Sequence, residues 1–214
     1  MQFTNMATTL RFMFLSFLAC ILVRPPDALA QQTVTLTEPS PVTIQELFKQ
    51  ADVVAVVRIR SGTTEQYPTT VYKAEIMQSF KGVRTGAKIF FGPYIHYRLG
   101  SEYLVFLQKS KRVLDPKEQN GTSDMNYGRI DSFYSVMYDG YSAMSVEDIC
   151  IFDGKDEGCD DGVKVNTYQI ILPKKLKTFP VDSDDVNRDD ERWVRKSVLI
   201  SFLRSLSKRE SSPE

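Results

Sequence analysis

The alternation of apolar and polar residues predicts short strands in the middle of the chain. Residues 53–60 (VVAVVRIR) are nearly all apolar and mostly β-branched, which is typical of a strand buried along most of its length. Within residues 71–80, polar positions at Lys73 and Glu75 alternate with apolar ones. The apolar positions that share one side of this predicted strand are Tyr72, Ala74, Ile76 and Phe80. Residues 102–108 (EYLVFLQ) are apolar on both faces, as in a central strand.

The predicted strands are separated by turns that contain glycine. Gly82 and Gly86 mark the return after the second strand, and the alternation resumes over residues 87–91. Strands about ten to fifteen residues apart, with Gly or Pro at each return, are typical of a small antiparallel barrel or sandwich. We therefore predict a mostly β fold, a small antiparallel OB-like barrel. Further strand-like segments in residues 129–172 would either extend the barrel or form a side sheet.

One helix is predicted at each end of the barrel sequence. Thr43 and Glu46 have the spacing of a capping box and introduce a short N-terminal helix. Residues 189–208 match an amphipathic C-terminal helix, with acidic residues at its start and basic residues at its end. Its apolar stripe consists of Val194, Val198, Leu199, Phe202, Leu203 and Leu206. We expect this helix to pack on the barrel, the alternative being a partner- or membrane-surface helix, and residues 209–214 to form a disordered tail.

The N-terminus has the features of a secretory signal peptide. An arginine precedes the apolar run 12–23, which is shorter than the roughly 20 residues that span a bilayer. A proline pair ends the run, and the sequence ALA up to Ala30 predicts cleavage before Gln31. We therefore predict a signal peptide over residues 1–30 and a secreted or periplasmic protein with no transmembrane anchor after cleavage. An uncleaved anchor and lipid attachment at Cys20 are the alternatives.

The chain that follows the predicted signal peptide is close to neutral. Of 27 basic and 27 acidic residues, Arg11, Arg24 and Asp27 lie in the signal peptide, so 25 basic and 26 acidic side chains remain. A net charge near zero gives no electrostatic basis for binding nucleic acid, which we exclude as a partner. The remaining length suits one domain, predicted over residues 41–208 after a linker at residues 31–40.

Two cysteines follow the signal peptide, Cys150 and Cys159. In an oxidising compartment an isolated pair predicts a disulfide, whereas a zinc site would need further ligands nearby. The surrounding segment is rich in carboxylates: Asp148, Asp153, Asp156, Glu157, Asp160 and Asp161. A calcium loop that starts at Asp153 would place Lys164 where a bidentate glutamate is needed. We therefore predict a solvent-exposed acidic loop and no metal or other cofactor.

Three short motifs follow one another along the chain: Ala51-Asp52-Val53-Val54, Phe80-Lys81-Gly82 and Gly100-Ser101-Glu102-Tyr103-Leu104-Val105. In this order they resemble the netrin-like module, the OB-type barrel shared with tissue inhibitors of metalloproteinases, over roughly residues 41–110. The resemblance implies an OB-type barrel of the bacterial exported type. Inhibitory members of that family use a cysteine at the mature N-terminus to cover the protease zinc. No cysteine lies between Gln31 and Ile149, so the resemblance implies the fold without the inhibitory mechanism.

Motifs that carry enzyme chemistry are missing from the sequence. There is no G-x-S-x-G, no phosphate-binding glycine loop and no H-E-x-x-H. We therefore predict a non-enzymatic binding or interaction module. The alternative is a periplasmic hydrolase whose carboxylate site the sequence does not locate.

OB barrels often present aromatic and basic side chains to their ligands. The candidate ligand-facing residues are Tyr94, His96, Tyr97 and Arg98, with Tyr103 as a further candidate. A partner of this module would be a protein, a peptide or a carbohydrate. The later tyrosines we interpret as structural: Tyr134, Tyr138 and Tyr141.

Overall fold

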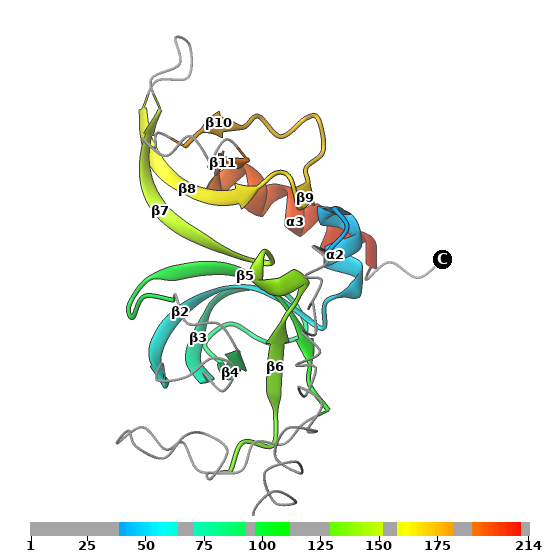
Figure 1. Ribbon diagram of the computed structural model, residues 1–214, viewed down its shortest axis with the longest axis vertical. Helices are drawn as coiled ribbons and strands as arrows, with labels where there is room; N and C mark the ends of the chain where they lie inside the picture. Colours follow the sequence, from blue (N-terminus) through cyan, green and yellow to red (C-terminus); the bar gives the residue numbers. More distant parts are fainter. Residues whose placement is uncertain are drawn as a thin grey trace, which may run out of the picture. The chain divides into compact units, whose positions relative to one another are not determined.

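The computed structural model describes residues 39–63, 71–92, 97–111, 129–151, 158–181 and 190–210. Within these ranges the protein combines a closed five-stranded β-barrel with a side sheet (Figure 1). The predicted signal peptide and most of the predicted linker lie outside the described residues.

Five strands close the barrel. They are β2 (Val53–Thr63), β3 (Val71–Lys81), β4 (Lys88–Gly92), β5 (Glu102–Lys109) and β6 (Phe133–Val136). The neighbour order is β5-β2-β3-β4-β6, and β6 pairs back with β5. The last two strands, β5 and β6, therefore exchange places relative to the chain order. The pair β4 and β6 is parallel, and the other barrel pairs are antiparallel. The predicted OB-like barrel is confirmed.

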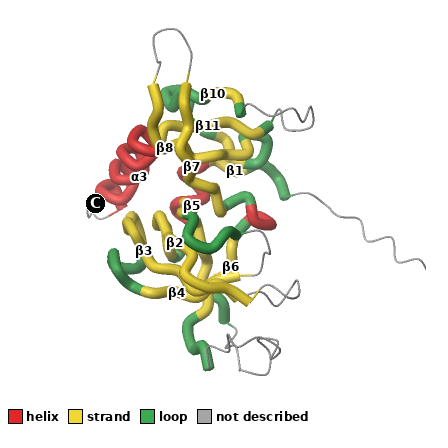
Figure 2. Tube along the Cα trace, turned by 90° about the vertical axis from the view of Figure 1, so that its left-hand side faces the viewer, coloured by secondary structure: helices red, strands yellow, loops and turns green. Residues whose placement is uncertain are grey.

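Beyond β5 the sheet continues into the side sheet. Both arrangements left open by the sequence for residues 129–172 therefore occur, since β6 closes the barrel and the following strands form the side sheet. Its strands are β7 (Ala143–Ile151), β8 (Gly158–Asn166), β11 (Glu191–Arg195) and β10 (Phe179–Pro180). The short turn η2 (Tyr138–Gly140) precedes β7. Two further strands, β1 (Val42–Thr43) and β9 (Ile170–Ile171), form a separate parallel pair. Figure 2 shows the barrel and the side sheet meeting at β5 and β7.

Strands β2 and β5 are buried on both faces because each face belongs to a different core. Alternate residues such as Val57 and Val105 point into the barrel, where they meet Ile76 of β3. The intervening residues, such as Val56 and Phe106, belong to a second core that also contains residues of the side sheet and of the helices α2 (Ile44–Gln50) and α3 (Lys196–Glu210).

Phe80 lies in the second core and not, as predicted, on the same side of β3 as Tyr72. Val56 pairs with Gln78, whereas Val57 pairs with Ile76, so that Met77 is an extra residue on β3. An extra residue in a strand reverses which side the following side chains face. The simple alternation in the sequence could not reveal this bulge.

The predicted N-terminal helix is confirmed in detail. Thr43 caps α2, since its Oγ1 accepts a hydrogen bond from the Glu46 amide at 3.2 Å and Glu46 reaches back to the cap. Ile44, Leu47 and Phe48 are buried on one face of the helix. This face joins the second core.

The C-terminal helix begins at Lys196 and not near Asp189, so the prediction of a helix over 189–208 was wrong at its start. Residues 191–195 form β11, which pairs with β8 along its whole length. Val194 belongs to the second core, while Trp193 packs with Phe179 in a separate cluster. Side chains that alternate between two packing surfaces have the period of a strand. The acidic residues expected in the first helical turn therefore precede the helix.

Helix α3 packs on the second core, which contains residues of both the barrel and the side sheet, whereas we had expected it to pack on the barrel. Leu199, Phe202 and Leu203 are buried, whereas Val198 is 42% exposed and does not belong to the buried face. The helix continues to Glu210, whose carboxylate forms an ion pair with Lys81 at 3.1 Å. The tail predicted from residue 209 therefore started too early.

Candidate functional site

Side chains fill the interior of the barrel. Tyr72 and Phe91 are fully buried there among apolar residues. The ring of Tyr97 packs against those of Tyr72 and Tyr103, with 4.9 Å between centroids in each pair. Burial raises the pKa of Tyr72 to about 12, because the low-polarity surroundings disfavour the phenolate. A ligand site therefore has to be sought outside the barrel.

The structure describes two of the four predicted ligand-facing residues. Tyr97, which is half-buried, and Arg98, which is exposed, lie in the connection that leads into β5. The Arg98 amide donates a hydrogen bond to the Tyr103 hydroxyl at 2.9 Å, which holds this connection against the strand. Tyr94 and His96 lie outside the described residues.

A cleft of about 500 Å³, here called the junction cleft, lies where the barrel meets the side sheet. Three tyrosines line it: Tyr97, Tyr103 and Tyr141. Its polar and charged residues are Arg98, Ser101, Asp139, Ser145, Glu147, Lys164, Asn166 and Glu191. The volume falls in the range of small-ligand sites. Tyr97, Arg98 and Tyr103 were predicted from the sequence as ligand-facing, whereas Tyr141 was interpreted as structural.

Opposite charges lie close together in the junction cleft. Lys164 Nζ is 3.5 Å from Glu191 Oε2, and the Ser145 hydroxyl donates a hydrogen bond to Glu147 Oε1 at 2.8 Å. Arg98 and Asp139, which are exposed, add one charge of each sign. The cleft therefore offers both hydrogen-bond donors and acceptors with little net charge.

The turn η2 places Asp139 in the cleft through an unusual backbone. Tyr138 and Asp139 have φ values of 50° and 48°, a region that residues other than glycine seldom adopt. The buried Ser142 holds the turn. Its hydroxyl accepts a hydrogen bond from the Met137 amide at 2.9 Å and lies within donating distance of the carbonyl oxygens of Met137 and Phe106, at 2.8 and 3.0 Å. Backbone of this kind persists where the surroundings enforce it and is frequent at binding sites.

A second cleft of about 400 Å³, here called the charged cleft, adjoins the junction cleft. The two share Ser101, Val146 and Glu147. Together they follow β7 along the seam between the barrel and the side sheet.

Lys196 joins the barrel to the side sheet by ion pairs within the charged cleft. Its Nζ lies 3.0 Å from Glu102 Oε2 on β5 and 2.8 Å from Asp161 Oδ2 on β8. Arg58 on β2 adds a 2.7 Å ion pair to Glu102. The four residues come from separate parts of the sequence, so no local pattern could have predicted the cluster.

The ion pairs keep these groups charged. Burial by itself would raise the pKa of Glu102, but hydrogen bonds from Lys196 and Arg58 outweigh it and lower the pKa below its ordinary value. For Lys196, burial would lower the pKa, and hydrogen bonds to Asp161 and Glu102 raise it instead. A general acid requires a raised carboxyl pKa, so the cluster has the properties of a structural ion-pair network.

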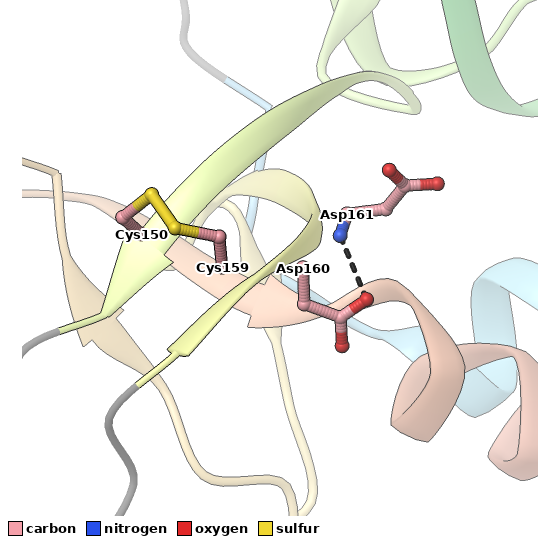
Figure 3. Close-up of a disulfide and its surroundings, with 4 residues drawn as sticks. All are labelled: Cys150, Cys159, Asp160 and Asp161. Carbon is pink, nitrogen blue, oxygen red and sulfur yellow. Dashed lines mark hydrogen bonds between the residues drawn. A yellow bond between two sulfur atoms is a disulfide. The ribbon is translucent and has the colours of Figure 1, made fainter.

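The predicted disulfide is confirmed. Cys150 on β7 and Cys159 on β8 are directly paired across the hairpin, and their sulfur atoms are bonded (Figure 3). Their Cα atoms lie 4.0 Å apart. The bridge therefore joins the two strands near the end of the hairpin.

The sequence predicted that the acidic segment forms a single loop, and this prediction was wrong. Asp148 lies on β7, and Asp160 and Asp161 lie on β8. The Asp161 amide donates a hydrogen bond to the Asp160 carboxylate at 2.8 Å (Figure 3). The high acidic content hid the strand alternation at these positions. Residues 152–157, with the other three carboxylates, lie outside the described part of the chain, and the described ranges contain no cluster of three or more His, Cys, Asp or Glu residues able to hold a metal ion.

Two of the three short motifs noted in the sequence meet in the structure. Gly82 has a φ of 85° and approaches Asp52 so closely that a Cβ at this position would lie 2.0 Å from the Asp52 carbonyl oxygen. The neighbouring Lys81 donates hydrogen bonds to the carbonyl oxygens of Phe48 and Lys49 at the end of α2, both at 3.0 Å. These motifs therefore fix the architecture and do not contribute to either cleft.

The strand order and the clefts define an OB-like barrel protein that has a side sheet and a groove at their junction. No protein-family model, curated protein or solved structure matches the chain. Among the residues that the structure describes, no helix is both long enough and apolar enough to cross a membrane. The function has to be argued from the geometry of the site.

Proposed function

We propose that the protein is an exported, non-enzymatic binding module built on a netrin-like barrel, with its ligand site in the junction cleft. One observation carries the proposal: the barrel interior is filled, while a tyrosine-lined cleft of about 500 Å³ lies beside it. Ligand sites are typically concave and lined by aromatic and apolar side chains with a few polar groups. The enforced backbone of η2 at the rim of the cleft is further support.

The fold and the disulfide support the other parts of the proposal. The closed barrel with its last two strands exchanged is compatible with a netrin-like module, which is an OB-type barrel. The Cys150–Cys159 bridge agrees with export, since disulfides persist in oxidising compartments. Metalloproteinase inhibition is not part of the proposal, because no cysteine lies between Gln31 and Ile149.

The carboxylates of the groove favour binding over hydrolysis. A hydrolase that uses paired carboxyl groups needs one of them to be protonated, and burial usually provides this. In the described part of the chain, Asp139 and Glu147 are exposed and Glu191 is paired with Lys164. The carboxyl pKa values that are shifted, those of Glu102 and Asp161, are both lowered.

A binding screen with two tyrosine variants tests the proposal. The whole exported protein is screened against arrays of glycans and peptides, together with Tyr141→Ala and Tyr168→Ala. Tyr168 is 56% exposed and lines neither cleft, so it is a matched control. We expect Tyr141→Ala to weaken binding of the captured ligand about tenfold or more, and Tyr168→Ala to leave it unchanged.

Two results would contradict the proposal. If neither array yields a ligand, there is no binding activity to explain. If a ligand is captured but neither substitution weakens its binding, the ligand binds outside the junction cleft. Conversion of a captured ligand into products would support the hydrolase.

A further inference from the structure

We propose that an extended basic peptide binds along β7 at residues 147–151 and adds to the side sheet as one more strand. This edge of β7 begins in the charged cleft, so the inference goes beyond the ligand proposed for the junction cleft. Three observations support it: a stretch of strand that is unpaired on one side, backbone groups that point outward from it, and an excess of carboxylates beside it.

Strand β7 extends beyond its partner β5. The last pair of these two strands joins Glu102, the first residue of β5, to Val146. Residues 147–151 continue β7 and remain paired with β8 along their other edge. Among the residues that the structure describes, no strand pairs with residues 147–151 on the side of β5. The side sheet therefore has an open strand edge here, where β7 continues past the barrel with β8 beside it (Figure 1).

The open edge presents backbone hydrogen-bonding groups. In antiparallel pairs, every second residue of a strand directs its N–H and C=O groups at the same neighbour. The Phe106 amide donates a hydrogen bond to the Ser142 carbonyl oxygen at 2.9 Å, so the even-numbered residues of β7 are those that face β5. Asp148 and Cys150 continue this set beyond the start of β5, and both are exposed. Their N–H and C=O groups therefore point toward a strand laid in the line of β5, which is how peptides bind to sheet edges.

The disulfide keeps this edge in strand form. Cys150 is bonded to Cys159, which lies directly opposite on β8. The bridge holds the two strands together without any bound partner. A preformed strand loses less conformational freedom on binding than a segment that has to become ordered. The edge is therefore organised for binding in advance.

The charges beside the edge favour a basic partner. The charged cleft is lined by four carboxylates and two cations: Glu102, Glu147, Asp148, Asp161, Arg58 and Lys196. Both cations form ion pairs with Glu102, and Lys196 also pairs with Asp161. Within the described ranges, no cation forms an ion pair with Glu147 or Asp148, the two carboxylates at the start of the edge. Two negative charges thus remain for cationic side chains of a partner.

The same charges disfavour a second copy of this chain as the partner. An open strand edge can in general pair with the same edge of another copy. Such pairing would bring Glu147 and Asp148 of one copy close to the same residues of the other, and like charges across a strand pair repel. Lysine or arginine side chains at these positions would be attracted instead.

The register of the edge predicts the sequence pattern of the peptide. All strand pairs of the side sheet are antiparallel. In this arrangement, successive peptide residues lie opposite Ile151, Cys150, Ile149, Asp148 and Glu147, and directly opposite side chains share a face of the sheet. We therefore expect apolar residues at the first and third peptide positions, and basic residues at the fourth and fifth. The sequence Val-Thr-Val-Lys-Lys has this pattern.

Titration of the whole exported protein, followed by fluorescence anisotropy, tests the inference. The probe is a labelled, end-capped peptide with the core Val-Thr-Val-Lys-Lys, and its comparator has glutamate in place of both lysines. We expect the basic peptide to bind about tenfold more tightly than the acidic one, or better. Its affinity should fall as salt is raised from about 50 to 500 mM, because screening weakens attraction between charges. Equal affinities for the two peptides would overturn the inference.

Methylation of the peptide nitrogens tests whether the peptide binds as a strand. In antiparallel pairing, the second and fourth peptide residues direct their N–H groups at Cys150 and Asp148, whereas the first and third direct theirs away. N-methylation of the second and fourth residues should therefore abolish binding. N-methylation of the first and third should change the affinity less than about threefold. Equal tolerance of both patterns, or the reverse sensitivity, would contradict the predicted pairing.

Matched charge substitutions locate the peptide on the protein. Asp148→Lys should weaken the basic peptide about tenfold or more and strengthen the acidic one. Asp131→Lys makes the same change of charge at an exposed position that lines neither cleft, and it should leave both affinities unchanged. Thermal midpoints of the two variants verify that both are folded. Equal effects of the two substitutions would mean that the peptide does not lie at this edge.

The remaining outcomes separate this inference from the proposed function. Tyr141 lines the junction cleft alone, so Tyr141→Ala should not affect the basic peptide. If Tyr141→Ala weakens its binding and Asp148→Lys does not, the peptide lies in the junction cleft, and the strand-edge inference is wrong. If sedimentation shows a dimer that Asp148→Lys disrupts, the edge pairs with a second copy. If the basic peptide does not bind at about millimolar concentration, the inference is overturned, while the array screen still decides the proposed function.

Discussion

Gly82 lies where the chain leaves β3 and passes the backbone of Asp52. The close approach and the positive φ together require a residue without a side chain. Gly86, in the same connection, also has a positive φ of 81°, but a Cβ there would meet nothing within 4 Å. The two glycines therefore separate the cost of a strained φ from the cost of a steric clash.

We predict that Gly82→Ala lowers the free energy of unfolding by about 3 kcal/mol or more, since the clash is with backbone and cannot be relieved by a rotamer change. Gly86→Ala should cost only about 1 kcal/mol, the cost of the left-handed conformation alone. Urea unfolding of both variants measures the difference. Equal losses in the two variants would mean that the contact with Asp52 does not constrain the fold.

Lys196 is the residue on which the ion pairs of the charged cleft converge. Lys196→Met keeps much of the side-chain volume but leaves the half-buried Glu102 with Arg58 as its remaining partner. We predict a loss of about 1–3 kcal/mol in the free energy of unfolding. Lys174→Met, an exposed lysine in the segment before β10, should be neutral within about 0.5 kcal/mol. Equal stability of the two variants would show that the network adds nothing.

The same network predicts how stability depends on pH. The pKa values of Glu102 and Asp161 are lowered in the folded protein. Their contribution to the stability of the fold is therefore present above the unfolded-state pKa of about 4. It is lost as the pH falls through the lowered pKa values of the folded protein. The pKa of Lys196 is raised, so its contribution is present below about 10.4 and is lost as the pH rises through the folded value.

Unfolding midpoints measured from about pH 2 to pH 12 test these two limits. We expect the stability of Lys196→Met to fall less steeply than that of the wild type at both the acidic and the basic end of this pH range. Parallel profiles for the two proteins would contradict the assignment.

Among the elements, the hairpin of β7 and β8 depends on its disulfide. The bridge closes a loop of sequence separation 9, for which chain entropy predicts a stabilisation of about 2–3 kcal/mol. We predict that the double substitution Cys150→Ser and Cys159→Ser, or reduction of the wild type, lowers the free energy of unfolding by this amount. The double variant should show no further change on reduction, and a further loss would point to an effect outside this bridge.

Elements defined by local patterns could be predicted from the sequence, and elements defined by pairing could not. The capping box at Thr43, the continuous apolar run of β2 and the alternation in β4 are local, and they placed these elements correctly. The strand β11 was mistaken for part of a helix, because Val194 fits a helical stripe as well as a strand face. Its true form depends on pairing with β8, which the local sequence does not encode.

At the scale of the whole molecule, the candidate site arises from the way in which the side sheet joins the barrel. The sequence singled out Tyr97, Arg98 and Tyr103 because they are aromatic or basic residues near one strand. It did not connect them with Tyr141 or Glu147, since only the pairing of β5 with β7 brings these residues together. The Asp139-Gly140 pair, which the sequence analysis did not use, is a turn signal in this region.

The central claim is that the junction cleft binds the ligand, and amide chemical-shift mapping by NMR tests it most directly. The labelled protein is titrated with the ligand that the array screen identifies. We expect the largest shifts within residues 97–103 and 139–147, which contain most of the residues that line the two clefts, while the outer surface of β3 and β4 changes little. Shifts concentrated on β3 and β4, with the groove unchanged, would contradict the account.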